Sequence, residues 1–258
     1  MIKGFKVVFN FKALNLFYIA QFFTNFVVYI VTLFVGISDK YKKNMKELKS
    51  KHYIQNLIED GEHEHQDFKF KISDARKIAR SISAFANNSG GHLLIGVKDN
   101  GKVVGIESEE EIYMIEQAAS MYCRPEQKVS YQSYRVEGRN VLKVDVAPAD
   151  VRPVKAQDDD KKWVAYYRVA DENIIASPLH VKVWQTMQEE ASSCISFEEK
   201  EHFLIEYLED HCEITIDEYM RDAHISKQAA EDSIVKLCAM KTLEIKYHNG
   251  KCVIVRCS

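Results

Sequence analysis

The sequence has little of the residues that define several protein classes. Only four prolines and ten glycines occur in 258 residues, which excludes a collagen-like or proline-rich low-complexity chain. The six cysteines all follow residue 122, and no two of them form a Cys-x-x-Cys pair. A disulfide scaffold, a zinc ribbon and a dithiol redox motif are therefore excluded, and we expect buried, reduced thiols of the kind found in cytosolic proteins.

Charged residues are absent from a long stretch near the N-terminus. No Asp, Glu, Lys or Arg occurs between Lys12 and Asp39, where Leu, Phe, Tyr, Ile and Val predominate. About 20 apolar residues are needed to cross the hydrocarbon core of a bilayer. The stretch predicts either a transmembrane helix at about 13–36 or a start assigned upstream of the functional protein, which would then begin at Met45. The body is accordingly expected in the cytoplasm, either free or held to the inner membrane by a single span.

Charge is unevenly distributed along the chain. Residues 1–44 carry six lysines and one aspartate, a net +5, whereas the whole chain has a net charge of −3. The remainder therefore carries −8. Because such a charge repels nucleic acid, any contact with that partner requires a local basic surface.

Hydrophobic periodicity predicts a mixed body after residue 45. Apolar positions at helical spacing indicate helices, and alternation indicates strands. The patterns predict helices at 46–60, 73–87 with Ser73 as N-cap, 109–122 and 178–190, and strands at 66–71, 92–98, 102–106, 128–136, 140–146 and 162–169.

The last part of the chain has a different pattern. After a linker at 191–198, three helices and a β-hairpin are expected, which is the order of a winged helix-turn-helix. The fold class is therefore α+β. A hydrophobic segment at 1–44 precedes a mixed α/β domain at 45–190 and a small winged helix-turn-helix domain at 195–258.

Carboxylates gather around one lysine near the first strand. Glu62 and Asp67 precede Lys69, and Asp99 follows a later strand. If the two strands are neighbours, Asp67, Lys69 and Asp99 converge at one end. Carboxylate oxygens so placed bind Mg²⁺ or Mn²⁺, which can activate water against a phosphodiester. The alternative is ordinary turn chemistry and a solvated acidic face.

One glycine pattern resembles a nucleotide-binding loop. Gly91 and Gly96 have the spacing of a phosphate-binding loop, but the lysine is Lys98, whereas the motif needs Lys directly after the second glycine. The segment is also expected to be a strand, whose amides pair within the sheet. ATP is therefore not expected as a cofactor, and nucleic-acid binding would require none.

Four segments carry a combined pattern. They are Glu62-x-Glu64-x-x-Asp67-Phe68-Lys69, Ala84-Phe85-Ala86-Asn87-Asn88-x-Gly90-Gly91, Ile95-Gly96-Val97-x-Asp99-x-Gly101-x-x-x-Gly105 and Tyr166-Tyr167-Arg168-Val169. Together, from about residue 55 to 185, the chain resembles the Schlafen-type AlbA-like domain family. This family is usually described as DNA-binding, and many bacterial members carry a C-terminal winged helix.

The resemblance also implies an RNA-cleaving site. In animal Schlafen proteins a carboxylate trio and a lysine cleave RNA, which here corresponds to Glu62, Asp67 and Asp99 as Mg²⁺ or Mn²⁺ ligands and Lys69 against phosphate. Two departures weaken the correspondence. Asp67 stands where the family usually has Glu, and the animal enzymes hold RNA between two such domains, so a homodimer would have to supply the second.

The predicted winged helix has an uneven charge of its own. From residue 194 to 220, one lysine stands against nine acids, whereas 221–256 holds seven basic and four acidic residues. Basic side chains thus gather on the predicted recognition helix and wing, where DNA contacts are made. The candidate contacts are Ser226, Lys227, Gln228, Lys236 and Lys246. Dimerisation or protein contact is the alternative use.

The sequence therefore favours a bacterial-type nucleic-acid-binding protein with a regulatory role. DNA is the favoured ligand and RNA stays open, with Lys69 and Arg168 making contacts from the AlbA-like domain. The alternative is a divalent-metal-dependent endoribonuclease, and a weaker one is a protein-interaction module in defence or signalling. A homodimer is expected, and a membrane is a partner only if 13–36 is an anchor.

Overall fold

The computed structural model describes residues 31–258 apart from 33, 41, 44, 46, 47, 50, 107–109, 189–196 and 258. The chain divides into two compact units, 1–53 and 54–258. The predicted transmembrane segment lies mostly outside the described residues. Within the described part, no helix has the length and apolar character needed to cross a bilayer.

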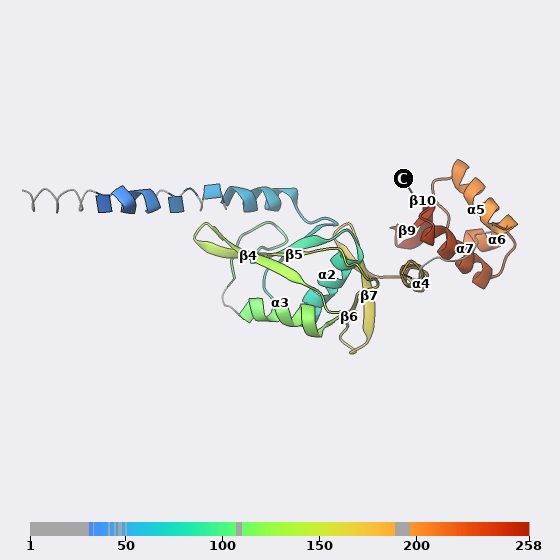
Figure 1. The fold of residues 1–258 in the computed structure, drawn as a ribbon, viewed down its shortest axis with the longest axis horizontal. Coiled ribbons are helices and arrows are strands. Elements are labelled where there is room, and N and C mark those ends of the chain that lie inside the picture. Colours follow the sequence, from blue (N-terminus) through green and yellow to red (C-terminus); the bar gives the residue numbers. More distant parts are fainter. Residues whose placement is uncertain are drawn as a thin grey trace, which may run out of the picture. The chain divides into compact units, whose positions relative to one another are not determined.

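The second unit contains a four-stranded sheet. Its order is β1 (Gln66–Lys69), β2 (Gly91–Ile95), β5 (Arg139–Val146) and β4 (Val129–Val136), of which β4 and β5 are labelled in Figure 1. β1 and β2 run parallel, and the other two pairs are antiparallel. The chain passes from β1 to β2 through helix α2 (Ala75–Asn87), because parallel neighbours need a crossover connection.

The two faces of this sheet are covered by different elements. Helices α2 and α3 (Glu110–Met121) belong to the larger core, which also buries Leu93, Leu142 and Val144 of the sheet. The other face buries Phe68 against residues 54–58 of the preceding helix. Complete burial of such a side chain contributes about 1.5–3 kcal/mol. Both faces of β1 and β2 are therefore partly enclosed, which places the polar residues of β1 in a sheltered position.

A second sheet lies on the other side of α2. Its order is β3 (Cys123–Arg124), β6 (Lys155–Gln157), β7 (Trp163–Val169) and β8 (Glu172–Ile175). Asn87, at the end of α2, holds it in place. Its Nδ2 donates to the carbonyls of Val154 and Tyr166 at 2.8 Å each, and its Oδ1 accepts from the Val154 amide at 2.8 Å.

The C-terminal elements follow the predicted order of three helices and an antiparallel hairpin. They are α5 (Glu199–Asp210), α6 (Ile216–Asp222), α7 (Lys227–Ala239), β9 (Leu243–His248) and β10 (Lys251–Arg256). Before them, α4 (Pro178–Thr186) begins at Ser177, whose side chain accepts from the His180 amide. Leu179 and Val183 of α4 belong to the core of these elements.

The structure corrects several local predictions. Asp74, not Ser73, caps α2. The alternation over 66–71 predicts that Phe68 and Phe70 share the buried face, opposite Asp67. In the structure Phe70 is half exposed and Asp67 is buried, because Arg168 and α2 cover the polar face of β1. The segment 102–106 forms a single bridge between Val97 and Val103 instead of a strand.

The short strands β3, β6 and β8 were not predicted, since two to four residues are too few to show alternation. The cysteines are mixed in environment: Cys123 and Cys238 are buried, but Cys212 and Cys257 are exposed.

Candidate functional site

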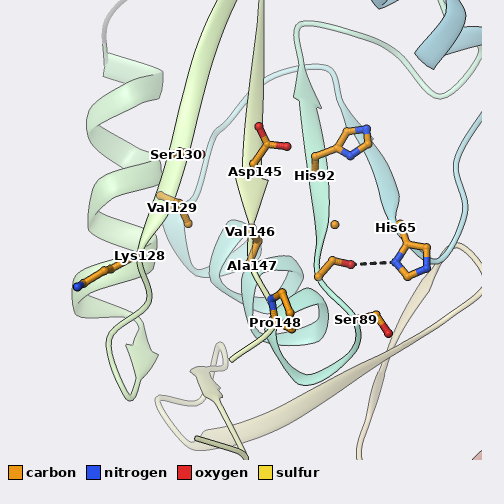
Figure 2. Close-up of a pocket in the computed structure, with 12 residues that line it drawn as sticks. His65, Ser89, His92, Lys128, Val129, Ser130, Asp145, Val146, Ala147 and Pro148 are labelled. Carbon is orange, nitrogen blue, oxygen red and sulfur yellow. Dashed lines mark hydrogen bonds between the residues drawn. The ribbon is translucent and has the colours of Figure 1, made fainter. Parts of the chain in front are cut away.

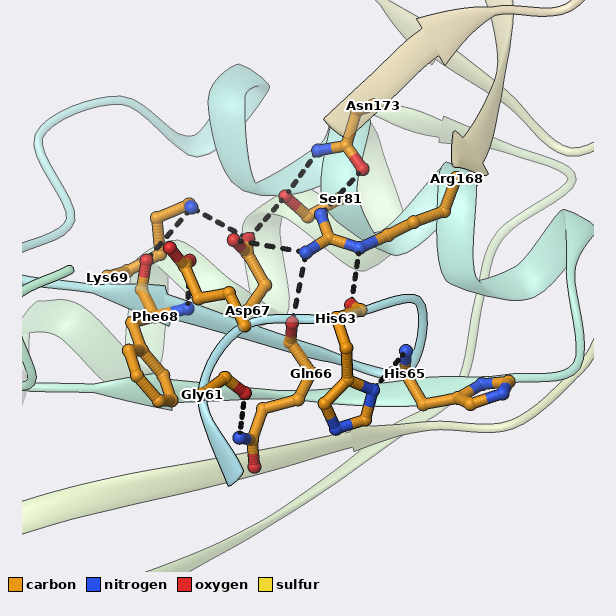
Figure 3. Close-up of polar contacts among 11 residues, drawn as sticks. Gly61, His63, His65, Gln66, Asp67, Phe68, Lys69, Ser81, Arg168 and Asn173 are labelled. Atoms are coloured by element: carbon orange, nitrogen blue, oxygen red, sulfur yellow. Dashed lines mark hydrogen bonds and ion pairs between the residues drawn. The ribbon is translucent and has the colours of Figure 1, made fainter. Parts of the chain in front are cut away.

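The strand β1 positions two of the predicted site residues. Asp67 and Lys69 lie two residues apart and so point to the same side of the strand. The Lys69 Nζ is 2.7 Å from the Asp67 Oδ2, and Ser81 of α2 donates to that oxygen at 3.2 Å (Figure 3). Asp67 is only 3% exposed, while the Lys69 side chain keeps 33% of its surface in solvent. The lysine therefore bridges a buried carboxylate and the surface.

Arg168 approaches the same carboxylate from β7. Its side chain has no exposed surface, and its Nη2 lies 3.5 Å from the Asp67 Oδ1. It also donates to the carbonyls of Gln66 at 3.0 Å and His63 at 3.2 Å (Figure 3). Because β7 packs against α2 and directs the side chain inward, direct contact of Arg168 with nucleic acid stays an untested prediction, and we do not propose it. Its guanidinium is the buried counterion of Asp67.

Glu62 completes this group, which we call the Asp67 cluster (Glu62, Asp67, Lys69, Ser81 and Arg168). The Glu62 Oε1 accepts from the Phe68 amide at 2.8 Å. Burial raises the pKa of Glu62, and so does a hydrogen bond with Asp67, although Lys69 opposes the shift. Two adjoining carboxyl groups favour one shared proton over two negative charges.

Asp99 does not join the Asp67 cluster. In the parallel register, Lys69 lies opposite Ile95, so Asp99 falls four residues beyond the end of β2, on an exposed turn. Among the described residues, no group of three or more His, Cys, Asp or Glu side chains could hold a metal ion. Asp67 is already paired with Lys69 and Arg168, and the metal-ligand role of Glu62, Asp67 and Asp99 stays a prediction.

The C-terminal candidates lie in different environments. Lys227 is the most open, with 72% of its side chain exposed. Ser226 caps α7 by accepting from the Ala229 amide, and Gln228 donates to Asp232 at 2.9 Å. Lys246 is half exposed and is 2.8 Å from Glu244.

Lys236 differs from these residues. Its Nζ lies 3.9 Å from Glu201 of α5, a residue that is almost completely buried, and 5.4 Å from the centre of the Phe197 ring. It therefore packs between helices, and we no longer expect it to contact DNA.

Sequence reasoning missed a concave surface beside the Asp67 cluster. It has a volume of about 530 Å³ and is lined by His65, Gly90, His92 and Asp145, among others (Figure 2). His92 forms a 2.7 Å hydrogen bond with the side chain of Gln66, and burial together with Lys143 lowers its pKa to about 4. The sequence indicates this surface only through His92, which begins a predicted strand. The pairing of His92 with Asp145 depends on the register of β2 and β5 and is not visible in the sequence.

Comparison with solved structures yields distant likenesses, among them the following two. The crystal structure of the DIP2311 protein from Corynebacterium diphtheriae has 18% identity and a TM-score of 0.41, with 75% of this chain and 37% of that chain covered. The N-terminal domain of a RecG-related protein from Nitrosomonas europaea has 22% identity and a TM-score of 0.35, with 50% of this chain and 95% of that domain covered.

The present chain thus spans little more than a third of the DIP2311 chain. No curated protein matches it. Family comparison does identify a domain, and it covers the Asp67 cluster, both sheets and α2. Residues 62–177, a little under half of the chain, match the family described as Schlafen, AlbA_2, and we refer to this matched segment as the AlbA_2 domain.

Proposed function

We propose that this protein binds nucleic acid through its AlbA_2 domain and acts as a regulator. The observation that carries the proposal is the match of residues 62–177 to a domain family associated with nucleic acid. Lys69 is the contact we propose within this domain, because it is held by Asp67 and still partly exposed. A cation fixed in this way pairs with a phosphate oxygen at a small further cost in side-chain entropy.

The charge of the Asp67 cluster supports this proposal. Two cations face Asp67, and the raised pKa of Glu62 increases the fraction of that side chain that is neutral. A phosphate that approaches Lys69 therefore meets little of the repulsion expected from a body of net charge −8.

We also propose that α5, α6, α7 and the β9–β10 hairpin form a winged helix that binds duplex DNA. The order of these elements supports it, as does the exposure of Lys227 at the start of α7. Lys182 of α4, however, is 2.8 Å from Asp232 of α7. This contact leaves the first turn, at Ser226, Lys227 and Gln228, as the part of α7 that we expect to meet DNA.

The test measures binding of the full chain to labelled duplex DNA, single-stranded DNA and single-stranded RNA by fluorescence anisotropy. Lys69→Gln and Lys227→Glu are compared with wild type, and Lys102→Glu, on an exposed turn, is the control. We expect affinity to fall by about tenfold or more between 50 and 200 mM salt, and to weaken on both substitutions, because each removed phosphate contact lowers the salt-dependent part of binding. Absence of binding to all three ligands would contradict the proposal.

A second candidate function is endoribonuclease activity, which the contacts among Glu62, Asp67 and Lys69 support. These three side chains are the ones that the family resemblance assigns to RNA cleavage, and the structure brings them together. Labelled tRNA is incubated with the full chain and Mn²⁺, with and without EDTA, beside a Glu62→Ala/Asp99→Ala variant. Equal cleavage by both proteins, or none by wild type, would remove this candidate.

Dimerisation is a further part of the proposal. A second AlbA_2 domain from a partner copy would enclose a bound strand, and light scattering of the full chain measures the oligomeric state with and without nucleic acid.

A further inference from the structure

We propose a second nucleic-acid contact site, specific for single strands, in a cleft formed by β3, β6, β7 and the end of α4. We call it the basic cleft, and the residues that define it are Arg124, Arg152, Lys155, Trp163, Gln185 and Gln188. Its volume is about 490 Å³, within the range of roughly 300–1,000 Å³ that is usual for sites holding a small molecule. One nucleotide of a longer strand fits a cleft of this size.

The charges of the basic cleft are the first argument. Arg124 and Lys155 lie directly opposite each other in the antiparallel pair β3–β6. Like charges in this position destabilise a sheet, and among the described residues no carboxylate lines the cleft. Several other cations are paired with acids, as in Lys200 with Glu198 and Lys182 with Asp232. The uncompensated pair favours an external anion as its partner.

Arg152 adds a third cation that is partly removed from water. Its Nη2 donates to the Asn88 carbonyl at 2.7 Å, and burial lowers the pKa of its guanidinium. Asn88 links Arg152 to the Asp67 cluster, because the side-chain oxygen of Asn88 accepts from the amide of Arg168 at 3.1 Å. A phosphate at Arg152 supplies the charge-assisted hydrogen bonds that this half-buried group lacks.

Trp163 supplies the aromatic surface that distinguishes nucleic acid from a simple anion. The Arg124 guanidinium lies 4.1 Å from the centre of the Trp163 ring. Unpaired bases stack on aromatic rings and on guanidinium planes, so a base on the outer plane of Arg124 extends this stack. In a duplex the bases are stacked on one another and cannot enter, which is why we assign the cleft to single strands.

Two glutamines close the cleft on the side of α4. Gln185 and Gln188 are exposed, and their amides can donate to and accept from base edges without adding charge. The basic cleft thus has room for one phosphate and one base. The cations at β3 and β6 would bind the phosphate, and the Trp163–Arg124 stack and the neutral amides would bind the base. This inference rests on the proposed nucleic-acid binding, but it involves none of the residues of the Asp67 cluster.

The experiment uses the full chain and a labelled single strand of about 12 nucleotides, the length of a typical single-strand site. An Arg124→Glu/Lys155→Glu variant is compared with a Lys102→Glu/Arg139→Glu variant, which changes the net charge equally on exposed residues outside the cleft. We expect the cleft variant to lose about tenfold or more in affinity and the control to change by less than about threefold.

A second measurement is independent of charge reversal. The chain has two tryptophans, Trp163 and the buried Trp184, so a Trp184→Phe variant leaves Trp163 as the only strong fluorophore. We expect saturable quenching of Trp163 by the single strand and little by a duplex.

The outcomes separate the two proposals. If wild type binds no nucleic acid, both fail. If it binds but the cleft variant matches the control and Trp163 is not quenched, nucleic-acid binding stands and the basic cleft is ruled out. Equal quenching by duplex and single strand would overturn the assignment to single strands.

Discussion

At the residue scale, the most informative contact is the buried pair of Arg168 and Asp67. Removing a charge from water is costly, and it is tolerated where the partner and further hydrogen bonds are well placed. Arg168 meets this condition with donors directed at Asp67, Asn173 and two backbone carbonyls. Its guanidinium also lies 5.0 Å from the centre of the Phe85 ring. The residue therefore joins β7, β1 and α2.

We predict that Arg168→Leu destabilises the protein by about 3–5 kcal/mol, because it removes the buried counterion of Asp67, leaving only the partly exposed Lys69, and leaves two backbone carbonyls without their donors. Urea unfolding of the full chain, followed by circular dichroism, measures this change. Arg256→Leu is the control, since Arg256 forms an exposed ion pair with Glu209 at 3.6 Å and such pairs contribute about 0–1 kcal/mol. Equal effects of the two substitutions would show that Arg168 has no special structural role.

At the element scale, two glycines determine how the chain leaves β2. Gly96 has φ +92°, and a Cβ there would lie 2.8 Å from the backbone carbon of Gly105. The sequence predicts facing strands here, in which Gly96 and Gly105 are small residues where another backbone or side chain comes close. The structure has this close approach, with the amides of Val104 and Gly105 both donating to the Gly96 carbonyl at 2.9 Å, although a single bridge takes the place of the second strand. This bend carries Asp99 away from the Asp67 cluster.

Gly96→Ala and Gly138→Ala separate conformational strain from steric overlap. Gly138 has φ +78° with no atom within 4 Å of a built Cβ, so its substitution costs only the left-handed backbone term of about 1–2 kcal/mol. Gly96→Ala adds a clash with backbone, for which we expect a further loss of about 1–3 kcal/mol. Unfolding free energies from urea denaturation test this order, and equal losses would refute the close approach.

At the scale of the whole unit, aromatic side chains connect the AlbA_2 domain to the C-terminal elements. Tyr167 of β7, His180 of α4 and Tyr247 of β9 have ring centroids 4.9–5.7 Å apart. The Tyr247 hydroxyl accepts from the Ser177 amide at 2.8 Å and lies 3.2 Å from the His180 Nδ1. Burial is the main cause that lowers the pKa of His180 to about 3, with Arg152 adding to it.

This arrangement predicts a stability that falls with acid. In the unfolded chain His180 takes up a proton near pH 6.5, whereas in the folded protein it stays neutral down to about pH 3. Its contribution is fully present above about pH 6.5 and is lost as pH falls towards 3, at up to about 1.4 kcal/mol per pH unit. The unfolding free energy of wild type minus that of His180→Gln, measured from pH 7.5 to 5, should decrease. A constant difference would contradict the buried, neutral state of His180.

Much of the local structure could be predicted from the sequence because it depends on neighbouring residues. The Ser177 cap with Pro178, the Ser226 cap of α7 and the end of α2 at Asn87 all follow from side-chain and backbone preferences within a few positions. The β-strands at 129–136 and 139–146 likewise agree with the predicted segments to within one residue. Charge imbalance along the chain is also a property of the sequence alone.

The sites depend on contacts between distant residues, which no local pattern contains. The parallel register of β1 and β2 left Asp99 outside the Asp67 cluster, and the packing of β7 on α2 made Arg168 a buried counterion of Asp67. The pairing of Arg124 with Lys155 joins positions 31 residues apart through a two-residue strand. The sequence by itself determined the helices, the longer strands and the match of residues 62–177 to the AlbA_2 family, because these depend on composition and spacing. Only the tertiary structure decided which charges are buried, which are paired and which remain available to a ligand, because burial is set by the whole fold.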